Sequence, residues 1–212
     1  MEIEINGKTY PIYITRKSIK NMYLRIKPGP KIEITASNRI SDKDIIKFIE
    51  NNIKYIYKHV TEKEKVSTAK EGKFEYLGHY YDIIYTDHRG VDITDTTAYI
   101  GKNTNIDNWY KKEAFDIFTE YYEDCLDNFK ESSKRPTLKI RRMKGKWGVC
   151  NVTNNTITLN QELIKLEPIC LEYVIYHELS HLVHHNHSKN FWNLVEKYVP
   201  NYKKIRKSMK NV

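Results

Sequence analysis

The feature that most constrains this chain is the segment PICLEYVIYHELSHLV at residues 168–183, which is apolar almost all round. It contains no glycine, and its single proline stands first, where a helix tolerates the missing N–H. A helix that is apolar on every side is stable only when other elements cover it. The sequence therefore predicts a buried helix that begins near Pro168.

Three polar residues inside this predicted helix, His177, Glu178 and His181, form the pattern H-E-x-x-H. Residues four apart lie on one helix face, about 6 Å apart along the axis, so two imidazoles can converge on one ion. Glu178 is rotated by about 100° and can address a water on that ion. Burying these groups without a partner is costly, and a metal ion would pair with them. The pattern also arises by chance, so a third ligand matters.

The best third ligand is His187, because its distance from His181 gives the spacing H-E-x-x-H-x-x-x-x-x-H of several zinc hydrolases. A helix end near His185, with Asn186 in a left-handed conformation, would fold His187 back to the ion. His184 competes, but it lies about 10 Å along the axis from the first histidine if the helix continues. Three imidazoles and an open position favour zinc. The predicted site consists of one Zn²⁺ ion on His177, His181 and His187, with Glu178 as general base.

The first hundred residues alternate apolar and polar side chains, as strands do, in YPIYIT, MYLRIK and KIEITAS. The sequence KPGPK at residues 27–31 predicts a tight turn between the second and third of these strands. Ser41 followed by Asp44 predicts the start of a helix, and apolar residues continue along one of its faces as far as Val60.

The pattern changes near residue 105, where a long stretch with helical spacing begins. Its predicted apolar side includes Phe115 and Phe118. Short strands are predicted at TLKIRRM and TITLN, and helices near Pro168 and after Ser188 and Pro200. Phe191 and Trp192 are expected in the core. These patterns predict an α+β protein with a β-rich region at residues 1–104, containing one helix, and a second region at residues 105–212.

Composition narrows the class of protein. The cysteines Cys125, Cys150 and Cys170 form no C-x-x-C pair, which indicates isolated thiols. No apolar run approaches the roughly 20 residues of a membrane span, and the N-terminus lacks a signal peptide. A cytoplasmic protein without a membrane partner is therefore expected. The net charge of +9 invites a polyanionic partner, although the abundance of Lys, Ile, Asn and Tyr is also what an AT-rich coding sequence gives.

Several stretches carry a resemblance to a known family: KWGVC, ITLN, EYVIYHELSHL and NHSKNFWNLVEKYVPNYK, together with ITRKSIKNMYLRI, YLGHYYDI and WYKKEA. On these residues the chain resembles the YgjP-like metallopeptidases, within the zincin group of zinc hydrolases. The resemblance implies a small mixed sheet packed on the active-site helix, which makes residues 105–212 the zincin-like catalytic domain. It also implies that His177, His181 and His187 bind zinc and that Glu178 is the base. The family usually has Arg-Trp-Gly-Ser-Cys at residues 146–150, so polar roles of that arginine and serine are not carried over.

The leading functional hypothesis is zinc-dependent hydrolysis of a peptide bond in a peptide or protein substrate. An extended substrate can add to an exposed edge strand near Trp147 or within residues 156–160, through main-chain hydrogen bonds. Trp147, Gly148 and Asn160 are therefore candidate substrate-binding residues. A tyrosine, lysine or arginine near the cleft is expected to stabilise the transition state.

An alternative keeps the metal and changes the substrate. The run SKRPTLKIRRMKGKWG contains seven basic residues and no acid, directly before the expected site strand. Such a run can hold a nucleoside triphosphate or place a protease on nucleic acid, with Arg141, Arg142, Lys144 and Lys146 as the contacts. Alternatively, the basic run forms a solvated surface without a binding role. A purely structural metal is disfavoured, because closed structural sites have four protein ligands and the predicted site has three.

Overall fold

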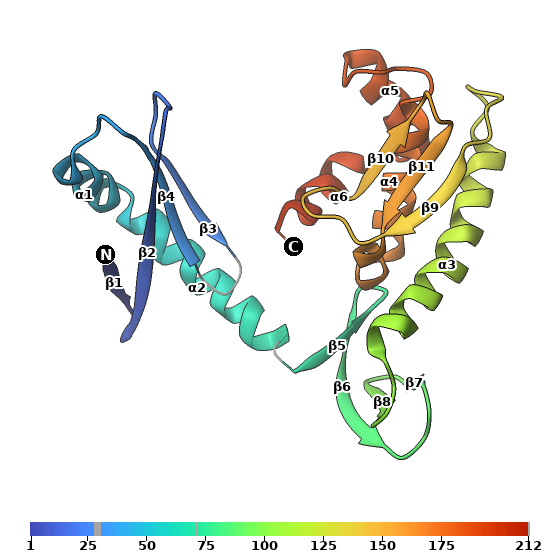
Figure 1. The fold of residues 1–212 in the computed structure, drawn as a ribbon, viewed down its shortest axis with the longest axis horizontal. Helices are drawn as coiled ribbons and strands as arrows, with labels where there is room; N and C mark the ends of the chain where they lie inside the picture. Colours follow the sequence, from blue (N-terminus) through green and yellow to red (C-terminus); the bar gives the residue numbers. More distant parts are fainter. Residues whose placement is uncertain (28–30, 71, 212) are drawn as a thin grey trace. The chain divides into compact units, whose positions relative to one another are not determined.

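The computed structural model describes residues 1–27, 31–70 and 72–211, without the side chains of residues 62–70 and 211. It divides into two compact units, Met1–Glu71 and Gly72–Val212 (Figure 1). The turn predicted at residues 27–31 falls largely outside the described residues.

The first unit is built on a four-stranded sheet with the strand order β1-β2-β4-β3. Strands β2 and β4 are parallel, and the two outer pairs are antiparallel. The turn between β1 and β2 is the two-residue sequence Asn6-Gly7, and both residues have positive φ, 52° and 76°, as a tight hairpin turn requires. The elements are β1 (Glu2–Ile5), β2 (Lys8–Lys17), β3 (Tyr23–Lys27), β4 (Lys31–Ser37), α1 (Asp42–Asn51) and α2 (Ile53–Lys70).

The helical start predicted in this unit is confirmed. The Ser41 hydroxyl accepts a hydrogen bond from the Asp44 backbone N–H at 3.2 Å and caps α1. The single helix predicted here is interrupted at Asn52, so two helices, α1 and α2, take its place. Their apolar side chains join those of the sheet in one core. Its helical members are Ile45, Ile49, Ile56 and Val60.

The second unit contains two further sheets, with the orders β5-β6-β8-β7 and β10-β11-β9. Both are mixed, because β6 and β8 are parallel, as are β9 and β11, and the remaining pairs are antiparallel. The mixture of strands and helices confirms the predicted α+β class. The strands are β5 (Lys73–Tyr76), β6 (His79–Thr86), β7 (Val91–Ile93), β8 (Thr97–Gly101), β9 (Thr137–Arg141), β10 (Gly148–Asn151) and β11 (Thr156–Asn160). The helices are α3 (Ile106–Asn128), η1 (Gln161–Lys165), α4 (Pro168–Ser180), α5 (Lys189–Tyr198), α6 (Tyr202–Ser208) and η2 (Met209–Asn211).

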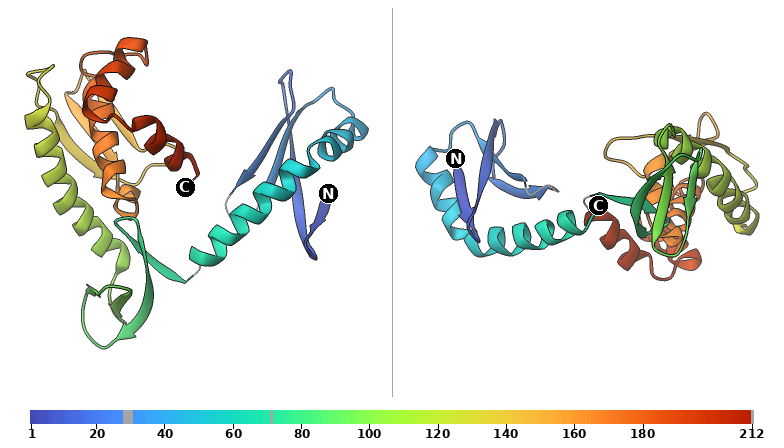
Figure 2. Two further views of the ribbon diagram at one scale, coloured as in Figure 1. Left: turned by 180° about the vertical axis from the view of Figure 1, so that it is seen from behind. Right: turned by 90° about the horizontal axis from the view of Figure 1, so that it is seen from below.

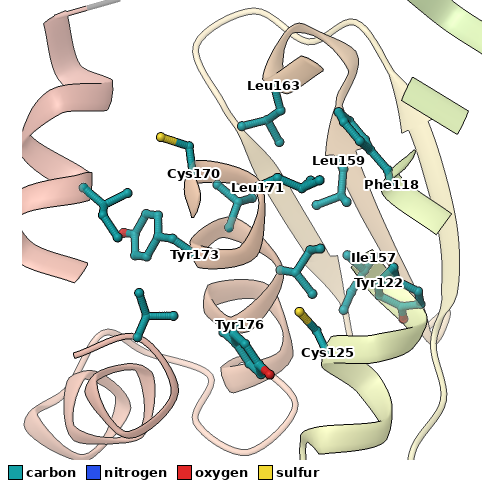
Figure 3. Packing of buried hydrophobic residues seen from close by; sticks show 14 of the residues in the cluster. Phe118, Tyr122, Cys125, Ile157, Leu159, Leu163, Cys170, Leu171, Tyr173 and Tyr176 are labelled. Carbon is teal, nitrogen blue, oxygen red and sulfur yellow. The ribbon is translucent and has the colours of Figure 1, made fainter. Parts of the chain in front are cut away.

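The core of this unit lies between the second sheet and its helices. Helices α3 and α4 contact each other and cover the same face of β10-β11-β9 (Figure 2). Figure 3 shows Ile157 and Leu159 of β11 among side chains of α3 and α4, including Phe118. Phe118 is fully buried, as predicted, but Phe115 is 63 % exposed. The prediction for Phe115 was wrong because the buried stripe of α3 passes through the small neighbour Ala114.

The compact units divide at residues 71/72, which differs from the predicted boundary at 104/105. The reason is packing, since Phe74, Ala98 and Ile100 of the sheet β5-β6-β8-β7 belong to the same buried cluster as α3 and α4. The prediction of isolated thiols is confirmed, because all three cysteines are free. Among the described residues, none of the helices combines the length and the apolar character of a bilayer-spanning segment.

Candidate metal centre

Helix α4 positions the site and is buried along most of its length, as its sequence predicted. It begins at Pro168 and ends at Ser180. Leu171, Ile175 and Leu179 are at most 2 % exposed, which indicates that packing fixes the helix before any ligand is considered. Its C-terminal turns therefore carry His177 and Glu178 on a rigid support.

Three imidazoles converge at the end of this helix. The ligand atoms that His177, His181 and His187 offer all lie within 4.8 Å of one another. The Nε2 atoms of His177 and His187 are 3.1 Å apart, and the three ring centroids are separated by 4.9 to 5.1 Å. His184 is not part of this cluster. Of the two candidates for a third ligand, the geometry brings in His187.

The chain reaches His187 by a different path from the one expected. Helix α4 ends five residues before His185. Asn186 does not have a positive φ, so it is not in the left-handed conformation. The predicted helix end and left-handed cap were therefore wrong. Tight turns follow Ser180, with the N–H of Leu182 donating to Leu179 at 2.9 Å. Helix α5 then starts with Ser188 as its cap, which is confirmed by the 3.4 Å hydrogen bond from the Phe191 N–H.

Hydrogen bonding and burial prepare two imidazoles as ligands. Nδ1 of His181 lies 3.2 Å from the carbonyl oxygen of His184, so Nδ1 carries the proton and Nε2 keeps a free lone pair. Burial, together with the charges of His181, His187 and Arg206, lowers the pKa of His177 to about 3. His177 is therefore neutral at pH 7, as a metal ligand must be.

Two aromatic rings of α5 wall the site. Phe191 is completely buried, and its ring centroid lies 4.6 to 4.9 Å from the centroids of all three imidazoles. Trp192 is half-buried and lies 5.5 Å from the ring of His187 and nearly parallel to it. Both residues were predicted only as core anchors, and their contact with the histidines depends on how α5 folds back on α4.

Glu178 stands beside the triad and is held in place from β10. Its side chain is buried, and it accepts a hydrogen bond from the Cys150 backbone N–H. Burial raises its pKa to about 7, although this hydrogen bond and the charge of Lys146 lower it. Gly148 makes the close approach possible, because a Cβ at this position would lie 2.6 Å from Glu178 Oε1. Its substitution would therefore disturb the carboxylate.

Two adjoining clefts meet at these residues. The larger, of about 480 Å³, is lined by residues of α4, β10, α5 and the C-terminal helices. The smaller, of about 310 Å³, continues past Cys150 and His185. Both include His177, Glu178 and His187. The convergent histidines thus face open space on both sides, which suits a catalytic metal with room for substrate rather than a closed structural site.

The donor set fits a divalent transition metal. Three imidazoles in reach of one point are the ligands of many zinc sites. The buried Nδ1 of His177 has no hydrogen-bond partner among the described residues, so this ring is oriented by packing and by its Nε2 contact with His187.

A sequence-family model described as YgjP-like, metallopeptidase domain, matches residues 20–212. The chain belongs to the YgjP-like family. A YgjP-like chain is a hydrolase of the metallopeptidase class, and a metal is implied for the histidine triad. The resemblance inferred from the sequence is thereby confirmed.

Two solved structures are also similar to this YgjP-like chain. The metallopeptidase zymogen abylysin of Pyrococcus abyssi is 29 % identical, over 45 % of this chain and 90 % of its own, with a TM-score of 0.36. The metallopeptidase zymogen jannalysin of Methanocaldococcus jannaschii is 26 % identical, over 45 % of this chain and 92 % of its own, with the same TM-score. A comparison with curated proteins gave no match.

The other residues singled out from the sequence of this YgjP-like chain do not all line the clefts. Trp147, Gly148 and Lys146 line the larger cleft. Asn160 is buried behind them, and its side chain donates to the carbonyl oxygens of Met143 and Lys146 at 2.9 and 2.8 Å. Asn160 therefore shapes the loop before β10, and it does not line either cleft.

The predicted anion contacts separate in the same way. Arg142 is engaged by Asp107 and Glu162, each at 2.7 Å, which removes it from the site. Arg141 and Lys144 are exposed and line neither cleft. Residues 156–160, proposed as an edge strand, form the central strand β11, and the edge strand that borders the clefts is β10.

Proposed function

We propose that the chain is a zinc metallopeptidase that cleaves a peptide bond with Glu178 as general base. The observation that carries the proposal is the convergence of three imidazoles beside a buried carboxylate, at the meeting point of two clefts. Family membership supports the peptidase class, and the geometry supports the assignment of roles.

His177, His181 and His187 would hold the ion. Zinc on three imidazoles with a free position supplies Lewis acidity at neutral pH. The protein contributes the neutral state of His177 and His181, through burial, and the fixed direction of the rings, through Phe191 and the His184 carbonyl.

Glu178 handles the proton. Its carboxylate takes a proton from the attacking water, and passes it to the nitrogen that leaves when the C–N bond breaks. The Cys150 N–H and the absence of a Cβ at Gly148 hold the carboxylate in one place while it does so. A base whose position is fixed before the reaction requires no further loss of orientational entropy in the transition state.

Strand β10 would bind the substrate. It is one of the two edge strands of its sheet, and it borders both clefts through Gly148. An extended peptide can pair with such an edge through main-chain hydrogen bonds, which bind peptides of many sequences. Trp147 would cover one side of the bound peptide.

The second candidate, hydrolysis of a nucleoside triphosphate, is favoured by one feature. Lys146 lies in the cleft with two further cations and only one acid. The engagement of Arg142 by Asp107 and Glu162 speaks against it. Association with nucleic acid would depend on the exposed residues Arg141 and Lys144, and would weaken steeply with salt.

The test uses the zinc-loaded full chain with a mixed-sequence peptide pool and, separately, with nucleoside triphosphates. We expect new peptide termini by mass spectrometry, which disappear with a chelator and in the Glu178→Gln variant. Release of phosphate or pyrophosphate without peptide cleavage would transfer the function to nucleotides. Full turnover by zinc-loaded Glu178→Gln would overturn the role of the glutamate.

A further inference from the structure

The larger cleft carries an excess of positive charge that the hydrolytic machinery does not use. Its charged lining residues other than the histidines are Lys146, Arg206, Lys210 and Glu178. The three cations outnumber the single carboxylate of Glu178. The walls of the cleft are therefore cationic, and such a cleft attracts anionic groups.

Arg206 differs from the two lysines because its position is fixed. Its guanidinium carbon lies 4.7 Å from the centroid of the Trp192 ring. Trp192 in turn stacks on the buried Tyr202, with centroids 5.1 Å apart and planes 9° apart. Stacking uses the face of a guanidinium and leaves the N–H groups at its edge free to donate. Arg206 is thus oriented before any ligand arrives.

Among the described residues, no side chain or carbonyl takes up the donors of Arg206. Within the described part of the chain, no carboxylate lies within ion-pair distance of this guanidinium, whereas Arg135 and Arg142 each bind two acids. A planar fork of free N–H donors, held by stacking, matches the two oxygens of a carboxylate.

Arg206 is also close to the metal ligands. Trp192, on which it stacks, lies 5.5 Å from the His187 ring. The guanidinium is therefore at most about 10 Å from His187, which corresponds to two to three residues of an extended peptide at roughly 3.3–3.6 Å each.

We propose that Arg206 binds a carboxylate of the substrate within two to three residues of the cleaved bond, so that the protein prefers acidic peptides. This inference rests on the proposed peptidase function. The carboxylate comes either from an Asp or Glu side chain or from the C-terminus of the substrate. The chemistry is the same in both cases, and the peptides used in the test separate them.

The test compares four peptide sets, with Glu or Gln at each varied position, and each with a free acid or an amide at the C-terminus. Binding is followed by tryptophan fluorescence of zinc-loaded Glu178→Gln, since Trp192 lies under the guanidinium, and cleavage is followed in the wild type. A charge-assisted pair on an exposed arginine predicts a preference of about 10-fold for the acidic partner. The set that carries the preference identifies the source of the carboxylate.

Variants of Arg206 make the test specific. Arg206→Met retains an apolar stem on Trp192 and should reduce the acidic-to-neutral ratio to near one, and Arg206→Glu should reverse the preference toward basic peptides. Arg206→Lys should give an intermediate ratio, because it keeps the charge and loses the fork. Lys207→Met is the matched control: its residue is exposed on the same helix, does not line the cleft, and should leave the ratio unchanged.

The outcomes separate the two proposals. Acidic preference in binding without any cleavage would support the carboxylate site and overturn the peptidase function. Cleavage without acidic preference, or an equal loss for acidic and neutral peptides in Arg206→Met, would overturn the carboxylate site alone. Tighter, Arg206-dependent binding of a nucleoside triphosphate than of any acidic peptide would also overturn it.

Discussion

Replacing Gly148 with alanine would push a methyl group against the carboxylate of Glu178. The new Cβ would lie 2.6 Å from Oε1 and 2.7 Å from Cγ of Glu178, and 2.8 Å from Cγ1 of Val174. Ordinary contact begins near 3.4 Å, so the carboxylate must move by roughly 0.8 Å. Displacements of about 1 Å cost about 100-fold in rate when a catalytic group is misplaced. We therefore expect kcat to fall by about 100-fold, and the free energy of unfolding by about 1–3 kcal/mol.

The assay is peptide turnover at saturating zinc, with the zinc content measured in parallel. Gly145→Ala is the control, because it strains the loop directly before β10, at a φ of 73°, while its Cβ meets no atom within 4 Å. It should lower stability by about 1–2 kcal/mol and leave the carboxylate in place. Wild-type turnover by Gly148→Ala with zinc bound would refute the reasoning, because Glu178 would then need no fixed position.

Two further perturbations test the packing and the pH dependence. Phe191→Ala should lower the free energy of unfolding by about 3–5 kcal/mol and weaken zinc binding, because the buried ring contacts all three imidazoles. The exposed Phe115→Ala should cost at most about 0.5 kcal/mol in chemical denaturation, and equal losses would contradict this. Burial raises the pKa of Glu131, but hydrogen bonds from Lys197 and Tyr198 outweigh it and bring the pKa below its usual 4.5. A carboxyl with a lowered pKa stabilises the fold above its unfolded pKa, and this is lost as the pH falls through the folded pKa. The stability difference between wild type and Glu131→Gln should therefore shrink below about pH 4.5, and a difference that does not depend on pH would contradict the assignment.

Local signals in the sequence predicted several helices, two of which, α4 and α5, position the site. Ser41 and Ser188 cap helices because a side-chain oxygen meets an N–H three residues ahead, which depends only on nearby residues. Helix α4 could be predicted because it is apolar on every side. The spacing of the histidines likewise predicted which rings would meet.

Long-range packing determined what the sequence did not predict. Strands β5 to β8 join the second unit because Phe74 and Ile100 share a core with α3 and α4, and no local pattern encodes that contact. The early end of α4 was missed because an apolar sequence continues beyond Ser180. Arg206 was hidden in a basic run, and its place over Trp192 follows from the packing of α6 on α5.

The measurement that tests the central claim most directly is the zinc stoichiometry of single alanine variants. Wild type should bind one zinc ion per chain. Replacement of His177, His181 or His187 should weaken zinc binding by more than about 100-fold, because loss of a ligand costs more affinity than loss of a residue that only hydrogen-bonds to a ligand. His184→Ala should bind like the wild type, because His184 supports the site only through its backbone carbonyl. Full zinc binding by His187→Ala, or its loss in His184→Ala alone, would contradict the account.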